Sequence, residues 1–156
     1  MILAVFSVNF EEHHVYGVLT ESDLEQLRTA MGGREQRMRF LVQQAATLPT
    51  FSAVERDMAQ EVFGCEARVW LLLNLRPDDT AEDSIEVRFD SESRVVKGLL
   101  ALIQQAVDGA SAQQVADYDL DAHLAALGLT DFVSSSRRNG LRAAVTLLKE
   151  SAARPG

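Results

Sequence analysis

Cys65 is the only cysteine of the chain, and its thiol is the side chain best suited to nucleophilic chemistry. One thiol cannot form an internal disulfide, and it cannot hold an iron–sulfur cluster by itself. Gly64 precedes it and allows the loop a positive φ. Glu61 and Glu66 disfavour a thiolate and Arg68 favours it, so the local charges do not predict an activated cysteine. Taken alone, these residues favour a buried, unreactive Cys65.

The three histidines offer little for a metal site. His13 and His14 are adjacent, so their side chains point apart in a helix or a strand. His123 falls in a predicted helix and has no histidine or cysteine three or four residues away. We therefore expect no bound metal and a surface position for His123. A catalytic pair of Cys65 with His123 or His14 is neither supported nor excluded by the spacing.

Arg137 and Arg138 stand at the predicted start of the last helix, where cations oppose the helix dipole. They are either solvated charges or partners for an anion, a thiolate or an acidic surface. Trp70, the only tryptophan, lies inside a predicted strand, and we expect it in the core. The chain has no phosphate-binding glycine loop, dinucleotide fingerprint, zinc-protease motif or serine-hydrolase motif.

Composition predicts a soluble globular protein of one domain, because 47% of the 156 residues are hydrophobic and 24% are charged. The net charge of −8 argues against direct nucleic-acid binding. Residues 1–17 are predicted to form an apolar arm or strand of unknown role, too short to span a membrane and without signal-peptide features. Residues 18–156 form the predicted domain. A lone thiol fits the reducing cytoplasm.

The first half of the chain is predicted to be helical. Ser22 and Glu25 resemble a capping box that opens a helix over residues 23–31. A second helix over residues 34–47 follows the Gly-Gly break and ends before Pro49. Its predicted buried side chains are Met38, Leu41, Val42 and Ala45. A short helix over residues 53–59 leads to the loop that carries Cys65.

The period of the hydrophobic pattern then changes to that of strands. Residues 67–75 are apolar almost throughout, and residues 84–89 alternate, with Ile85, Val87 and Phe89 on one face. The polar segment 76–83 connects the two and predicts an antiparallel hairpin. A hairpin is marginally stable alone, so helices must cover one side of it. The predicted class is α+β, a small antiparallel sheet packed by helices on one side.

The second half returns to helices. The longest has a predicted N-cap at Ser91 and a terminating glycine at Gly109, with apolar residues over four turns. Ser111 and Gln114 resemble another capping box. A helix over residues 120–127 ends at Gly128, and the last helix follows residues 134–136. Its predicted buried side chains are Leu141, Ala144, Val145 and Leu148.

Three motifs resemble those of the SufE/CsdE family of sulfur-acceptor proteins. The segment Phe63-Gly-Cys-Glu-Ala-Arg-Val-Trp70 is similar to the family signature in which Gly-Cys is followed closely by Val-Trp. The segment Asp90-Ser-Glu-Ser-Arg94 resembles the start of the family's long helix. Ser134-Ser-Ser-Arg-Arg-Asn-Gly-Leu141 resembles the start of its last helix. The likeness covers about residues 18–152 and is closer to the CsdE branch.

The resemblance implies a SufE/NifU-like fold and a function. It implies that Cys65 accepts persulfide sulfur from a PLP-dependent cysteine desulfurase of the SufS/CsdA type. It further implies that Gly64 gives the loop flexibility, that Arg137 supports the thiolate or persulfide, and that Glu92 modulates the loop. The chain itself would be an accessory carrier and activator without a cofactor, not an enzyme. Arg138-Asn139 replaces the family's Ser-Gln, and Phe63 stands where smaller residues are common.

The resemblance leaves the destination of the sulfur open. It suggests an iron–sulfur scaffold or, for the CsdE branch, a tRNA-modifying protein that resembles ubiquitin-activating enzymes. Two other functions remain open from the residues: a thiol enzyme, which needs a base near Cys65, and an interaction module with an incidental cysteine. We expect a monomer, with weak dimerisation left open by the edge strand and the arm.

Overall fold

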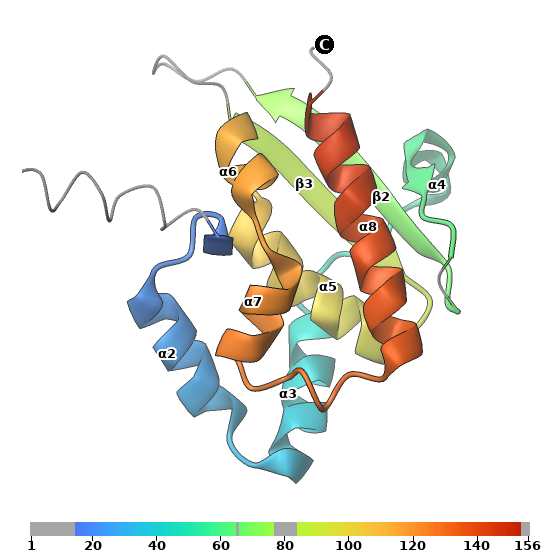
Figure 1. Ribbon diagram of the computed structural model, residues 1–156. Coiled ribbons are helices and arrows are strands. Elements are labelled where there is room, and N and C mark those ends of the chain that lie inside the picture. The colour runs from blue at the N-terminus through green and yellow to red at the C-terminus, as the bar shows by residue number, and fades with distance from the viewer. Residues whose placement is uncertain (1–14, 65, 77–83, 154–156) are drawn as a thin grey trace, which may run out of the picture.

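The computed structural model describes residues 15–64, 66–76 and 84–153 (Figure 1). The predicted arm up to residue 14, Cys65, most of the polar turn and the last three residues lie outside this part. Within it, seven α-helices and three strands follow one another in this order: α2 (Glu21–Met31), α3 (Arg34–Ala45), α4 (Ala53–Met58), β1 (Gln60–Glu61), β2 (Val69–Arg76), β3 (Ser84–Ser91), α5 (Arg94–Val107), α6 (Ala112–Asp117), α7 (Leu120–Ala126) and α8 (Ser135–Ala153).

The sheet confirms the predicted antiparallel hairpin. Its strands lie in the order β1-β2-β3, and Leu71 of β2 pairs with Phe89 of β3. Successive side chains of a strand point to opposite faces. One face is buried in the core and carries Val69, Leu71, Ile85, Val87 and Phe89. Strand β1 was not predicted, because two residues are too few to show a period.

Helix α5 is the centre of the core, as its apolar pattern predicts, and eight of its residues are buried. It lies so close to α3 that a Cβ on Gly98 would stand 2.2 Å from the carbonyl oxygen of Leu41. Helix α8 packs on the same side of the sheet and crosses β2 (Figure 1). The four residues predicted to be buried on α8 are all buried. The α+β class is therefore confirmed.

Helix α4 lies apart from these helices and contacts β2. None of its residues is buried, and Val54 and Met58 are 67% and 72% exposed. Trp70 is buried, as predicted, but it is not part of the hydrophobic core cluster. It alternates with the core-facing Val69 and Leu71, so it points to the opposite face of the sheet. The prediction that helices cover only one side of the sheet is therefore wrong, because α4 lies on the other side.

Two predicted helix caps are wrong by two residues. Thr20, not Ser22, caps α2 and exchanges hydrogen bonds with Asp23 in a capping box. Ser93, not Ser91, caps α5. Ser91 belongs to β3, where its hydroxyl donates to the carbonyl oxygen of Arg68 at 2.8 Å. Each segment contains two hydroxyl residues that can cap a helix. Helix α2 starts earlier than predicted, so Thr20 is its cap. Strand β3 extends to Ser91, so the cap of α5 is Ser93.

The buried stripe of α3 is narrower than predicted, and the helix ends at Ala45. Leu41 and Ala45 are buried as predicted, together with Phe40. Met38 and Val42 are instead 41% and 38% exposed, because they lie at the flank of the face that α5 covers. Predicted caps hold elsewhere: Ser111 and Gln114 form a capping box, and Gly109 and Gly128 follow α5 and α7 with positive φ. Across the described ranges, no helix has the length and apolarity needed to cross a membrane.

Candidate functional site

Cys65 belongs to the loop between β1 and β2, and its own position lies outside the described residues. The loop is closed at its base by a hydrogen bond from the Val62 amide to the Val69 carbonyl oxygen at 2.9 Å. Gly64 has φ of 95°, which favours glycine at this position, and a Cβ there would meet open space. Phe63 is 84% exposed, so it is not a core anchor for the loop. The positive φ therefore explains why a glycine precedes the cysteine.

Two side-chain contacts hold the residues that follow the cysteine. The Ser136 hydroxyl on α8 donates a hydrogen bond to the Glu66 carboxylate. Arg68 donates two hydrogen bonds to the Glu61 carboxylate, at 3.1 and 2.8 Å. These bonds hold the pKa of Glu61 below its usual value. The two ends of the loop are thus joined by an ion pair, and its second half is joined to α8.

A small pocket of about 70 Å³ opens beside the loop. Apolar and polar residues line it: Glu66, Ala67, Val69, Ser93, Val96, Leu100, Ser136, Arg137, Gly140 and Leu141. Arg137 and Glu66 come from segments far apart in the sequence and meet here. Of the predicted site residues, Arg137 lines this pocket, Gly64 lies on the loop, and Glu92 does not reach the pocket lining. A guanidinium beside a thiol favours the thiolate, so the lining by Arg137 makes this pocket able to hold a thiolate or another anion.

The two adjacent arginines of α8 have separate roles. Arg138 donates to the carbonyl oxygens of Thr130 and Val133, at 2.8 and 3.1 Å, and so fixes the turn before the helix. The half-buried guanidinium of Arg137 has no hydrogen-bond or ion-pair partner among the described residues. Its positive charge is therefore available to the pocket and to the loop beside it.

Glu92 lies close to the same loop without entering the pocket. Its amide donates to the carbonyl oxygen of Arg68 at 3.3 Å. The pKa of Arg68 is raised, first by its hydrogen bond and charge pairing with Glu61 and to a smaller extent by the charge of Glu92. Glu92 therefore acts on the electrostatics of the loop base.

His123 is buried, so the expected surface position is wrong. Its Nδ1 lies 2.7 Å from the Tyr118 hydroxyl, and its ring meets the edge of Tyr16. Burial lowers the pKa of His123 to about 4. The residue lies with Leu120, Leu124 and Leu127 on one helical stripe, and that spacing could have predicted its burial. His123 does not line the pocket beside the loop, which weighs against a pair with Cys65.

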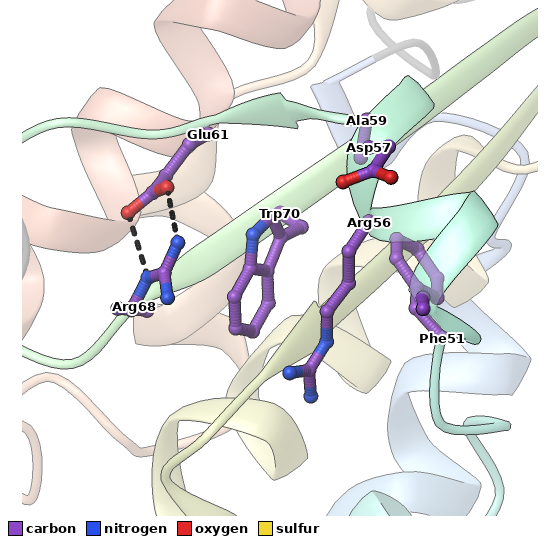
Figure 2. Close-up of a pocket in the computed structure, with 8 residues that line it drawn as sticks. Phe51, Arg56, Asp57, Ala59, Glu61, Arg68 and Trp70 are labelled. Atoms are coloured by element: carbon purple, nitrogen blue, oxygen red, sulfur yellow. Dashed lines mark hydrogen bonds and ion pairs between the residues drawn. The ribbon is translucent and has the colours of Figure 1, made fainter.

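A second pocket, of about 520 Å³, lies on the other side of the loop base and was not predicted (Figure 2). Eight residues of α4, β1, β2 and their connections line it: Phe51, Ala53, Arg56, Asp57, Ala59, Glu61, Arg68 and Trp70. The guanidinium groups of Arg56 and Arg68 lie over the Trp70 ring, 4.3 and 4.9 Å from its centroid. No group of three or more metal-ligating side chains occurs in residues 15–64, 66–76 and 84–153.

These observations define an α+β domain that carries a single cysteine on a glycine loop between two strands, with a pocket beside the loop that an arginine helps to line. The sequence model of the SufE family, described as an Fe-S metabolism associated domain, matches residues 22–152. The chain therefore belongs to the SufE family, as its motifs predict. Within the family, the closer likeness to the CsdE branch stays a prediction.

Two relatives have similar length and are themselves uncharacterised SufE-like proteins. The one from Rhizobium etli is 30% identical over 118 residues, which cover 76% of this chain and 79% of the relative. The one from Rhizobium meliloti is 32% identical over 120 residues, which cover 76% and 84%. The solution structure of a hypothetical protein from Thermus thermophilus matches 85% of this chain and 91% of its own, with a TM-score of 0.63 and 20% identity. That structure supports the fold alone.

Proposed function

We propose that this protein is a sulfur acceptor and carrier that receives persulfide sulfur on Cys65 from a PLP-dependent cysteine desulfurase. The observation that carries the proposal is the position of Arg137. Its unpartnered guanidinium lines the pocket that Glu66, the neighbour of Cys65, also lines, among the residues that the structure describes. Membership of a family associated with Fe-S metabolism supports the same function.

The transfer step is a thiol–persulfide exchange. The Cys65 thiolate attacks the outer sulfur of the desulfurase persulfide, forms a new S–S bond and breaks the existing one. The desulfurase thiolate is the leaving group and takes up a proton from solvent or a nearby acid. Sulfane sulfur moves from one cysteine to another, so no external oxidant or reductant is required. The positive charge of Arg137 stabilises the anionic thiolate and, after transfer, the persulfide anion.

The chain itself supplies the acceptor and needs no cofactor in this proposal. PLP belongs to the desulfurase, where it labilises the C–S bond of L-cysteine. The protein acts as an accessory factor in the cytoplasm, and it stimulates the desulfurase by removing its persulfide. The onward destination is iron–sulfur cluster assembly through a scaffold, with a tRNA-modifying partner as the alternative.

The proposal is tested by desulfurase turnover with L-cysteine, followed as alanine formation with a reductant present. Wild-type protein should raise the turnover number, because removal of the persulfide regenerates the desulfurase. Cys65→Ser should fold, as circular dichroism can show, and give no stimulation. Equal stimulation by wild type and Cys65→Ser would reject an acceptor function for this cysteine and favour an interaction module.

A further inference from the structure

The indole of Trp70 is enclosed by arginines instead of by the hydrophobic core. Figure 2 shows Arg56 and Arg68 on opposite sides of the ring, the first from α4 and the second from the end of the cysteine loop. A guanidinium over an indole face is attracted by the ring quadrupole and held against it. The ring therefore orients both cations without using their N–H groups, and those of Arg68 donate to Glu61.

Among the residues that the structure describes, Arg56 differs from Arg68, Arg76 and Arg88 in having no carboxylate partner. Arg68 pairs with Glu61, Arg76 with Glu86 and Arg88 with Glu55, at 2.8, 2.7 and 2.6 Å, all within the described ranges. Over those same ranges, the guanidinium of Arg56 makes the Trp70 stack and no hydrogen bond or ion pair. A stacked guanidinium presents its donors in a fixed fork that matches a carboxylate.

We propose that the pocket around Arg56 and Trp70 binds a carboxylate side chain on the surface of the protein that donates sulfur to Cys65. This inference rests on the proposed function and assigns part of the contact surface with that partner. The site adjoins the acceptor loop, because Arg68 closes both the loop base and one side of the pocket. A partner that reaches Cys65 must therefore approach this pocket.

The surroundings of the pocket favour a protein over a small anion. Val54 and Met58 lie on α4 two residues before and after Arg56, so they point away from its face of the helix, and both are exposed, as is Phe63 on the loop. Exposed apolar side chains on the elements that carry the pocket add contact area for a protein partner, whereas a small anion would contact only the cation. Asp57 also lines the pocket, and Figure 2 shows its carboxylate pointing away from the guanidinium of Arg56. Its negative charge should weaken the binding of an acidic side chain.

The test measures the affinity of a PLP-loaded cysteine desulfurase for this protein by isothermal titration, at low and at high salt. Arg56→Ala should weaken binding about tenfold, as for a central arginine of an interface. Arg56→Lys should lose part of that affinity, because it keeps the charge without the planar fork. Asp57→Asn should strengthen binding about twofold, and the difference between variants should shrink at high salt. Arg28→Ala is the matched control, since exposed Arg28 lies on α2 at the far side of the molecule (Figure 1).

Sulfur uptake by wild-type protein, measured in parallel, separates this inference from the proposed function. If wild type gains sulfur and Arg56→Ala binds as tightly as wild type, the pocket is not the contact, although the function stands. An equal loss in Arg56→Ala and Arg28→Ala would also overturn the inference, because the effect would then be general charge. Weaker binding by Asp57→Asn would mean that the pocket takes a cation. If wild type neither binds the desulfurase nor gains sulfur, the proposed function itself fails.

Discussion

The hydroxyl of Ser136 at the start of α8 donates a hydrogen bond to the carboxylate of Glu66, the residue after Cys65. This contact joins two segments that are 70 positions apart in the chain. Because α8 packs on the sheet through its buried face, the contact fixes the second half of the cysteine loop to the body of the protein. Outward movement of Glu66 with the loop toward a partner must break it.

Loss of this hydrogen bond should make Cys65 more accessible. An exposed hydrogen bond contributes little net free energy, so Ser136→Ala should raise the rate of Cys65 alkylation by iodoacetamide about twofold. Ser135→Ala is the matched control, because the Ser135 side chain makes no hydrogen bond to the described residues. Equal alkylation rates in wild type and Ser136→Ala would show that the contact does not restrain the loop.

Removal of the charge at position 137 should make the Cys65 thiol less reactive. Without the Arg137 guanidinium the thiolate loses the cation that lines the pocket, and the alkylation rate at pH 7 should fall about three- to tenfold. Arg137→Lys should retain part of the rate. Arg142→Ala removes another cation of α8, one that is paired with Asp121 on α7, and this variant should be alkylated at the wild-type rate. A wild-type alkylation rate in Arg137→Ala would show that Arg137 does not act on the Cys65 thiol.

Buried His123 should make the fold sensitive to mild acid. The pKa of His123 is about 4 in the folded state and about 6.5 in the unfolded chain, so the unfolded state binds more protons between these values. Folding stability should therefore be complete above pH 6.5 and fall as the pH drops toward 4, by about 2 kcal/mol between pH 7 and pH 5.

Urea unfolding of wild type and His123→Gln at pH 7 and pH 5 measures this contribution. The variant is expected to be less stable at pH 7, because it disturbs the contact with Tyr118, but its loss between the two pH values should be smaller. The shifted carboxylates, Glu55, Glu61 and Glu86 among them, have lowered pKa values and act at lower pH. The same pH dependence in both proteins would contradict the assignment to His123.

The close approach of α3 and α5 should make Gly98 intolerant of a side chain. A Cβ at this position would stand 2.2 Å from backbone, which cannot move aside without separating the helices. Gly98→Ala should lower the free energy of unfolding by about 2–3 kcal/mol. Gly109→Ala is the control, because its Cβ meets nothing and only its φ of +82° is unfavourable, at about 1 kcal/mol. Equal losses in the two variants would contradict the expected clash between α3 and α5 at Gly98.

Local patterns in the sequence predict most of the elements. The alternation of Ile85, Val87 and Phe89 predicts the core face of β3, and the buried face of α8 follows its helical period. The choice of cap between Ser91 and Ser93 depends on where β3 ends, which is set by pairing with β2 over a long separation. Such a tertiary contact has no local signal, so that cap could not be predicted.

The candidate site divides in the same way. One short motif predicts Cys65 and Gly64, and a second motif predicts Arg137. The structure shows that the second motif lies beside the loop, because Arg137 and Glu66 line the same pocket. The stack of Arg56 on Trp70 could not be predicted. It depends on the short pairing of β1 with β2, which brings α4 to the back of the sheet.

Mass spectrometry of the intact protein after incubation with a cysteine desulfurase, PLP and L-cysteine tests the central claim most directly. Wild-type protein should gain sulfur that a reductant removes, and peptide mapping should place it on Cys65. Neither Cys65→Ser nor a sample without desulfurase should gain it. Sulfur on Cys65→Ser, or none on wild type with a desulfurase that binds it, would contradict the proposal that this protein carries persulfide sulfur.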